Sequence, residues 1–428
     1  MRNKVSNNKN RSTDLWRFDA WLGVFMLWPF AAMVRAFAKF RSPHAKKIVW
    51  LFFVFFGFVF VYGRGDFAGL DSGDYARRLV DLHNNWSGFE YFKYTFFSKG
   101  QNVDFYQPVV TWIVAYFTGN PRWLFAVFSA VFGYFYVQNM WLIFDRIDQK
   151  QRVNLLLVLF MFAFALTNPI WQINGVRMWT AAQVFIYGLF KYILEKDNKG
   201  VMWIFSSILF HFSFFIPIAI LFIYRFLPKN LTGLLIFFYL SSFVSELNME
   251  ATRSFLSFLP DFLQPRVEGY TSEAYVESRS ASTLNITLHE LFASTASRWM
   301  LYVWVFIIYI KRKYWLDHHK AIKHLFMLGL FMGGVAQILS NIPSGGRFML
   351  LVNVIFYAIF VLFVSEQKMD LQLKYIKNIS ILVLFFIIIF KFRIGFDYMG
   401  ISTLFSNPIV AFFVEDTEPL IIFVKKLF

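Results

Sequence analysis

Long apolar runs alternate with short polar segments along most of this chain. From residue 107 onward the apolar runs cover 107–118, 123–144, 153–171, 176–194, 201–224, 231–247, 290–310, 321–340, 348–365 and 379–394. Most of them approach the roughly 17 to 25 residues that a helix needs to cross a hydrocarbon core. Together with an earlier run at 48–62, the pattern predicts an all-α polytopic integral membrane protein with about 10–12 membrane segments.

The N-terminal region differs from the rest. Residues 1–17 are polar and basic, and the apolar stretch 18–34 is interrupted by Pro29 and has basic residues on both sides. A segment with two basic flanks is more typical of an interfacial or shallow hairpin element than of a full crossing. We therefore expect two parts: a basic tail and interfacial segment over 1–47, and a single transmembrane helical domain over 48–428.

Composition supports a membrane protein and excludes several other classes. The chain has 428 residues, of which 58% are hydrophobic, 16% are charged and 59 are Phe, which is more apolar than a soluble core requires. The formal net charge of +16 lies mainly in short basic runs between apolar segments, where Lys and Arg orient helices, so no nucleic-acid partner is expected. The absence of Cys excludes disulfides and thiolate chemistry.

The distribution of charge predicts which loops share a side of the membrane. Loops 311–324 and 366–378 are basic and are expected to be cytoplasmic, which places 248–289 and 341–347 outside. We favour an arrangement in which 107–118 only dips into the bilayer and 201–224 breaks at Pro217. The alternative, in which every segment spans, leaves the basic loop at 150–152 outside and Arg177 inside.

Polar residues between the first crossing and residue 107 form a candidate site in an external loop, 63–106. Asp71 and Asp74 fall at the start of a predicted amphipathic helix on the membrane surface, in which Tyr75, Leu79 and Leu82 recur at helical spacing. Either this is an ordinary solvated helix, or Asp74 and Tyr75 face an external cavity.

The second external loop, 248–289, has mixed charge and two tyrosines, and it either binds a polar ring such as a sugar or is ordinary surface. Arg266 and Tyr270 are its candidate binding residues. His289 and Glu290 stand where the loop enters a helix, and Arg298 lies about two turns deeper, where an ionised group is costly.

Two further arginines and one histidine lie beside or inside apolar helices. Arg177 lies at the start of the apolar run 176–194, and Arg347 follows a turn of Pro and two Gly, where it either pairs with an anion or snorkels to the headgroups. His211 and Ser213 lie within an apolar segment, and we expect His211 to bond to a neighbouring helix, so that His211→Ala harms yield before chemistry. Gly329 and Gly333 indicate close helix packing.

These residues, in this order, resemble the EpsG family of bacterial exopolysaccharide proteins, which is grouped with the Wzy-type polysaccharide polymerases. The resemblance covers roughly residues 48 to 415. It rests on a D-x-x-D-Y region, a G-V-R helix start and an H-x-S element, followed by an external loop, an Arg after a short turn and a terminal N-P segment. The residues that carry it are Asp71, Asp74, Tyr75, Arg177, His211, Ser213, Tyr270, Arg347, Asn407 and Pro408.

The resemblance implies a GT-C-like bundle with amphipathic and external loop helices in the bacterial inner membrane, with its active site facing outward. Its expected function is to polymerise undecaprenyl-diphosphate-linked oligosaccharide repeat units into O-antigen, capsule or exopolysaccharide. The implied partners are that lipid-linked substrate, the bilayer, and a chain-length regulator and flippase of the same pathway. Two alternatives stay open: a polysaccharide ligase, and a non-enzymatic transporter or flippase of lipid-linked glycan.

The chemistry of such a reaction selects candidates among the charged residues. Arginine pairs bidentately with phosphate oxygens, so Arg177, Arg298 and Arg347 are expected to converge on the leaving diphosphate. Tyr75, Tyr270 and Arg266 are further binding candidates. Removing a proton from the attacking hydroxyl requires a base, for which Asp74, His289 and Glu290 are the candidates. A single direct displacement would invert the anomeric centre. No D-x-D element is present, so we expect the reaction to need no metal or cofactor.

Overall fold

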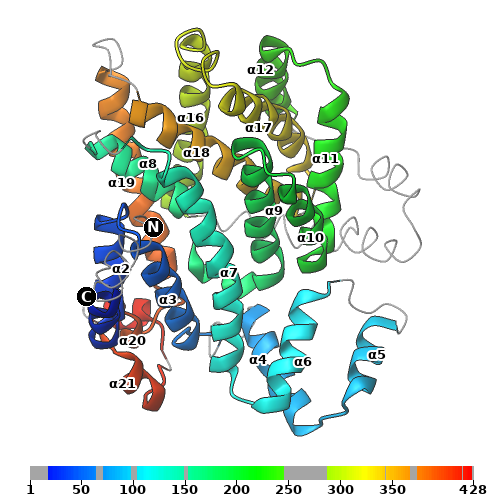
Figure 1. The fold of residues 1–428 in the computed structure, drawn as a ribbon, viewed down its shortest axis with the longest axis vertical. Helices are drawn as coiled ribbons and strands as arrows, with labels where there is room; N and C mark the ends of the chain where they lie inside the picture. The colour runs from blue at the N-terminus through cyan, green and yellow to red at the C-terminus, as the bar shows by residue number, and fades with distance from the viewer. Residues whose placement is uncertain are drawn as a thin grey trace, which may run out of the picture.

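A computed structural model describes residues 18–63, 71–97, 104–148, 153–244, 287–342, 344–366, 374–416 and 418–426, and all regular structure in these ranges is helical (Figure 1). Six segments are long and apolar enough to cross a membrane: Pro121–Phe144, Leu155–Leu194, Leu288–Ile310, Lys320–Leu339, Gly345–Glu366 and Lys374–Gly395. Shorter apolar helices cover Phe18–Leu27, Pro29–Ala38, Lys199–Phe210, Phe212–Phe226 and Leu231–Phe243. The all-α polytopic prediction is confirmed, and 10–12 segments are reached only when the shorter helices are counted.

The N-terminal elements show the predicted interruption at Pro29. One helix ends at Leu27, and α2 (Pro29–Ala38) begins at the proline, where a missing backbone N–H costs nothing. The next helix, α3 (Ala45–Phe58), has 14 residues and is therefore about 21 Å long. This helix begins three residues before the predicted run 48–62 and ends four residues before the end of that run, and its membrane crossing stays a prediction.

The centre of the bundle is built from α7 (Pro121–Phe144), α8 (Leu155–Ala165), a 3-10 turn η2 (Ile170–Gly175) and α9 (Val176–Leu194). Helices α3 and α9 both pack against α7. The next helix, α10 (Lys199–Phe210), returns along α9, and the two cross at glycines. A Cβ on Gly188 would lie 2.6 Å from the Gly200 carbonyl oxygen, so only glycine permits this approach.

The predicted break in 201–224 exists, but it lies at His211 and not at Pro217. His211 is extended (φ −153°, ψ 121°) and separates α10 from the turn η3 (Phe212–Phe214) and from α11 (Phe215–Phe226). Pro217 lies in the first turn of α11, where the backbone N–H has no intrahelical partner to lose. Each of α10 and α11 has 12 residues, which is about 18 Å of helix.

Four of the six long apolar segments lie in the second half of the bundle. Its elements are α12 (Leu231–Leu240), η4 (Ser241–Phe243), α16 (Leu288–Ile310), α17 (Lys320–Leu339), η5 (Gly345–Phe348), α18 (Met349–Glu366) and α19 (Lys374–Gly395). A Cβ on Gly333 would meet the Phe238 ring at 2.6 Å, which confirms the packing role expected for Gly329 and Gly333. The loop after α16 contacts the end of α18, since Trp315 Nε1 donates to Glu366 Oε2 at 2.7 Å.

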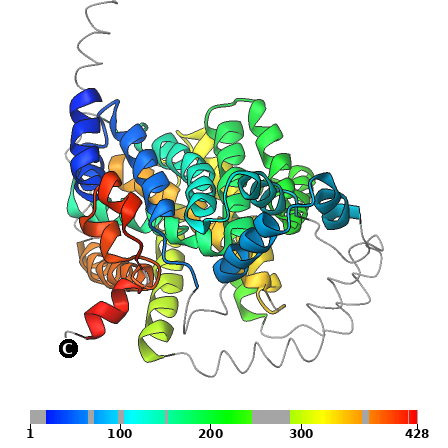
Figure 2. The same cartoon turned by 90° about the horizontal axis from the view of Figure 1, so that it is seen from below.

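The C-terminal helices α20 (Ile401–Phe405) and α21 (Pro408–Phe413) lie beside the N-terminal helices, as Figures 1 and 2 show, and α22 (Leu420–Lys425) follows them. Buried Arg122, at the start of α7, fixes the end of α21. Its guanidinium donates to the carbonyl oxygens of Phe58, Ala411, Phe412 and Val414.

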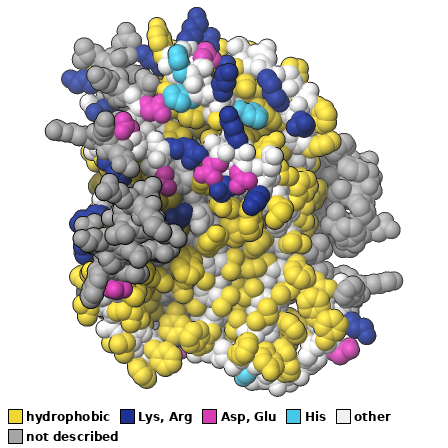
Figure 3. All heavy atoms as spheres, in the orientation of Figure 1, with side chains coloured by type: hydrophobic (Ala, Val, Ile, Leu, Met, Phe, Trp, Pro, Cys, Tyr) yellow, Lys and Arg dark blue, Asp and Glu magenta, His cyan; other side chains and the backbone are white. Residues whose placement is uncertain are grey.

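Three shorter helices, α4 (Asp71–Asn84), α5 (Phe89–Phe97) and α6 (Tyr106–Phe117), occupy the lower end of the view in Figure 1. The amphipathic character predicted for 71–84 is confirmed, because Tyr75, Leu79 and Leu82 are buried on one face. That face packs against α6 and α7, and the predicted location of this helix at the membrane surface stays a prediction. Figure 3 shows most of the charged side chains of the visible face in its upper half and a broad apolar surface below.

Candidate functional site

A buried carboxylate joins three segments that are distant in sequence. Asp104 lies immediately before α6, with a side chain only 1% exposed. It accepts hydrogen bonds from Arg177 Nη1 at 3.0 Å, from His211 Nδ1 at 3.0 Å and from the Phe212 backbone N–H at 2.9 Å. One carboxylate therefore fixes the start of α9 and the break between α10 and η3.

Local structure explains why these groups meet. Arg177 is the second residue of α9, where η2 delivers the chain from α8. The end of α10 is tied to the Asp104 segment by a backbone bond from Phe105 N to Leu209 O at 3.0 Å. Because His211 is extended, the Phe212 N–H points away from the α10 ladder and is free to bond to Asp104.

Tyr75 adds a fourth group from α4. Its hydroxyl accepts from Arg177 Nε at 3.3 Å, and its ring is buried against Phe128. Burial raises the pKa of the Tyr75 hydroxyl, which is therefore protonated at neutral pH. The Arg177 side chain is 29% exposed, so part of its guanidinium remains accessible beside the Asp104 contact.

The electrostatics keep Asp104 ionised. Burial by itself raises the pKa of this carboxyl, but the hydrogen bond from His211, the charge of that ring when it is protonated, the charge of Arg177 and the Phe212 N–H together lower it. Since His211 Nδ1 faces a carboxylate, the hydrogen-bond network assigns the ring proton to Nδ1. No hydrogen bond joins Nε2 to a residue in the described ranges, and in a neutral ring this nitrogen can accept a proton.

A second place with convergent polar groups is a cavity of about 270 Å³ between α8, α16, α18 and α19. Arg347 and Lys391 both line it, together with Gln172, Trp179, Ser297 and Asn353. Arg347 lies in the turn η5, which begins directly after Ser344, and the backbone of Ser344 is in the left-handed region (φ 69°). The predicted site residue Arg347 thus faces a cavity, and sequence reasoning missed its neighbour Lys391.

The three arginines expected to converge do not share one hollow. Arg177 belongs to the Asp104 cluster, and Arg298 is exposed on α16. The described lining of the Arg347 cavity includes neither of them, although it includes Trp179 and Ser297 from the same helices. The cluster and the cavity are linked through Phe214 of η3 and Phe348 of η5, whose ring centroids are 6.5 Å apart.

The proposed bases Asp74, His289 and Glu290 are exposed and make local contacts. Asp74 pairs with Arg77 one turn along α4. Glu290 Oε2 accepts from the backbone N–H of Thr287 at 3.0 Å in a capping box, and His289 Nε2 lies 3.1 Å from the Thr287 hydroxyl. The structure brings none of these three to Arg177, and their catalytic roles stay predictions.

Of the remaining predicted residues, two lie outside the described ranges and two are described. Arg266 and Tyr270 lie outside the described residues. Ser213 lies in η3, where its hydroxyl is 3.9 Å from Met178 Sδ on α9. The expected contact of His211 with another element is confirmed, although its partner Asp104 precedes a helix rather than lying in one.

Asp104, like Lys391, is a candidate site residue that sequence reasoning missed. A signal was present, because Arg177 and His211 need a compensating charge and Asp104 stands directly before the apolar run at 107–118. Nothing in local spacing, however, connects positions 73 and 107 residues apart.

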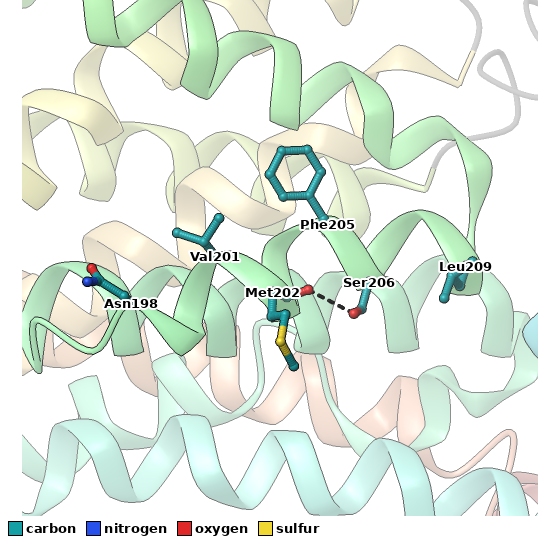
Figure 4. Close-up of a pocket in the computed structure, with 6 residues that line it drawn as sticks. All are labelled: Asn198, Val201, Met202, Phe205, Ser206 and Leu209. Atoms are coloured by element: carbon teal, nitrogen blue, oxygen red, sulfur yellow. Dashed lines mark hydrogen bonds between the residues drawn. The ribbon is translucent and has the colours of Figure 1, made fainter.

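The outer face of α10 also has an open depression, lined by Asn198, Val201, Met202, Phe205, Ser206 and Leu209 (Figure 4). Its one drawn hydrogen bond runs from the Ser206 hydroxyl to the Met202 carbonyl of the same helix, at 2.8 Å. Exposed apolar side chains with no convergent polar groups are typical of a lipid-facing surface. Among the described residues, no group of three or more His, Asp or Glu is placed to hold a metal, and the metal-independent reaction stays a prediction.

Comparison with known proteins gives one match. No curated protein and no solved structure matches the chain, so the GT-C-like assignment stays a prediction. The model of the EpsG family matches residues 47–403, which is most of the sequence and contains both the Asp104 cluster and the Arg347 cavity. The chain therefore belongs to the EpsG family, and it is a polytopic membrane protein of exopolysaccharide biosynthesis.

Proposed function

We propose that the protein is a membrane glycosyltransferase that polymerises undecaprenyl-diphosphate-linked oligosaccharide repeat units at the external face of the bacterial inner membrane. Family membership supports the pathway. The observation that carries the reaction type is the Asp104–His211 pair beside Arg177, because a histidine oriented by a buried carboxylate is a suitable general base.

In this proposal His211 Nε2 takes the proton from the attacking sugar hydroxyl. The hydroxyl oxygen forms a bond to the anomeric carbon of the donor while the bond from that carbon to the diphosphate oxygen breaks. The configuration at that carbon is therefore inverted. Asp104 holds the ring in the required tautomer and stabilises the imidazolium without taking the proton, as in other carboxylate-oriented histidines.

Arg177 has two roles here. One nitrogen of its guanidinium balances the charge of Asp104, and the exposed remainder is available to oxygens of the substrate. A positioned general base contributes about 10²- to 10⁴-fold to such a proton transfer. Loss of His211 Nε2 alone should therefore reduce turnover by that factor while binding is retained.

The test uses purified full-length protein in liposomes with a lipid-linked repeat unit. A ladder of lengthening glycans supports a polymerase, a single addition to a foreign acceptor supports the alternative ligase, and no covalent change supports a transporter.

His211→Asn is the informative variant, because its amide N–H can replace the Nδ1–H donor to Asp104 but cannot take up a proton. We expect normal yield and a turnover at least about 100-fold lower. His211→Gln, which places its amide nearer Nε2 and loses the Asp104 contact, is the control for folding. Near-normal turnover in a well-folded His211→Asn protein would refute the base assignment.

A further inference from the structure

The cavity lined by Arg347 and Lys391 carries positive charge without compensation. No acidic residue is among its lining residues. Within the described ranges, neither the guanidinium of Arg347 nor the ammonium of Lys391 makes a side-chain hydrogen bond or ion pair. Both cationic side chains line one hollow without an acidic side chain in its lining, so a bound anion would balance their charge.

Lys391 faces this cavity because of its position on α19. Ile387 and Ile388, which precede it by four and three residues, line the same cavity and so lie on the same side of the helix. Arg393, two residues further along, is exposed instead and pairs with Asp397 at 2.9 Å. An ammonium on the inward face of a membrane-crossing helix is costly, and such residues usually mark a ligand path.

The size and shape of the lining suit a compact polyanion. A volume of about 270 Å³ equals that of roughly nine water molecules in the liquid. Arg347 offers a planar fork of donors, Lys391 a point charge, and Gln172, Ser297 and Asn353 neutral polar groups. Trp179 adds an apolar wall.

We propose that this cavity binds a diphosphate group, that of a prenyl-diphosphate-linked donor, between Arg347 and Lys391. The assignment to the donor rests on the proposed function. The contact between Phe214 and Phe348 places this anion site next to the segment that carries His211, which suits a donor on one side and an acceptor on the other.

The test is a direct binding measurement that needs no glycan transfer. Full-length protein in phosphatidylcholine nanodiscs is titrated with undecaprenyl diphosphate, and bound lipid is counted by native mass spectrometry. We expect Lys391→Met and Arg347→Gln each to weaken binding about 10- to 100-fold, as for loss of one hydrogen bond to a charged group. Lys391→Arg should restore most of the affinity, and Arg393→Met, on the exposed side of the same helix, should change it less than twofold.

Thermal stability separates a binding role from a structural one. Without ligand, Lys391→Met should be at least as stable as the wild type, because it removes an uncompensated charge. A Lys391→Met protein that is less stable and still binds normally overturns the proposal, as does equal binding by all variants.

Competitors distinguish the sources of the anion. Displacement by inorganic pyrophosphate supports the site and shows that the diphosphate alone is recognised. Displacement by prenyl diphosphate but not by pyrophosphate supports it and adds recognition of the prenyl chain. Equal displacement by phosphatidylglycerol overturns it in favour of an ordinary headgroup site. Tight binding of the diphosphate without a glycan ladder would support this binding site and refute the polymerase. A glycan ladder with unchanged binding in the variants would support the polymerase and refute this binding site.

Discussion

Replacing Asp104 by Asn tests the buried carboxylate that joins α9 to the α10–η3 break. Asp104 accepts three hydrogen bonds, from Arg177, His211 and the Phe212 N–H. An Asn amide keeps the shape, but it removes the charge and turns two donor hydrogens toward groups that are themselves donors. Breaking one partner of a buried ion pair costs about 3–5 kcal/mol. We expect the lower end, since Arg177 is 29% exposed and can recruit water.

The loss is measurable as an apparent melting temperature. One kcal/mol corresponds to about 2–4 °C for a domain of 150–250 residues, so a 3 kcal/mol loss predicts a decrease of roughly 6–12 °C. The chain has 14 Trp and no Cys, so intrinsic tryptophan fluorescence is a suitable probe and thiol-reactive dyes are not. Unfolding of a membrane protein is commonly irreversible, so both proteins are heated at one scan rate.

Asp74→Asn is the matched control, because its carboxylate is exposed and pairs only with Arg77 on the same helix. Such a surface pair contributes about 0–1 kcal/mol, so its melting temperature should stay within a few degrees of the wild type. If Asp104→Asn melts within 1 °C of the wild type, or if the control is equally damaged, the cluster does not stabilise the fold as argued.

The same substitution predicts a dependence on pH. The pKa of Asp104 is lower in the folded protein than the value of about 3.9 for an unfolded Asp. Its stabilisation is therefore fully present above that value and is lost as the pH falls through the lower, folded pKa. The advantage of the wild type over Asp104→Asn should therefore shrink as the pH falls below about 4. An advantage that is no smaller at about pH 3 than at about pH 5 would contradict the assigned charge state of Asp104.

Two further predictions concern the turn before α18 and the C-terminal clamp. A Cβ on Gly345 would lie 1.9 Å from the Leu339 carbonyl oxygen, so Gly345→Ala should disrupt the turn that carries Arg347 and abolish diphosphate binding. Gly346→Ala is the control and should bind normally, because its added Cβ would lie no closer than 3.6 Å to another atom, Ser340 Oγ. A lysine at position 122 cannot bond to all four carbonyl oxygens at once, so Arg122→Lys should lower the free energy of unfolding by about 1–3 kcal/mol. The variant should also expose residues 401–426 to limited proteolysis. Unchanged protection from the protease would show that these Arg122 contacts are dispensable.

Helix positions were predictable because the signal is local. The apolar runs 176–194 and 231–247 correspond closely to α9 and to α12 with η4, since hydrophobicity is a property of consecutive residues. Pro217 misled because a proline breaks a helix only in its interior, and here it occupies the first turn of α11. The side chains that pair with one another were harder to predict than the helices. The Asp104 cluster depends on which polar residues come together after the helices pack, and no local pattern in the sequence encodes these contacts.

The two short helices on either side of His211 have a consequence for the surrounding lipid. Each is about 18 Å long, whereas a bilayer core is about 30 Å thick. Their outer surface is apolar, so we expect the bilayer to thin locally around them or water to reach the break at His211 between the two helices. In the proposed reaction, the hydrophilic sugar chain would then reach the His211 imidazole from the aqueous side, while the isoprenoid that carries it stays in the hydrocarbon.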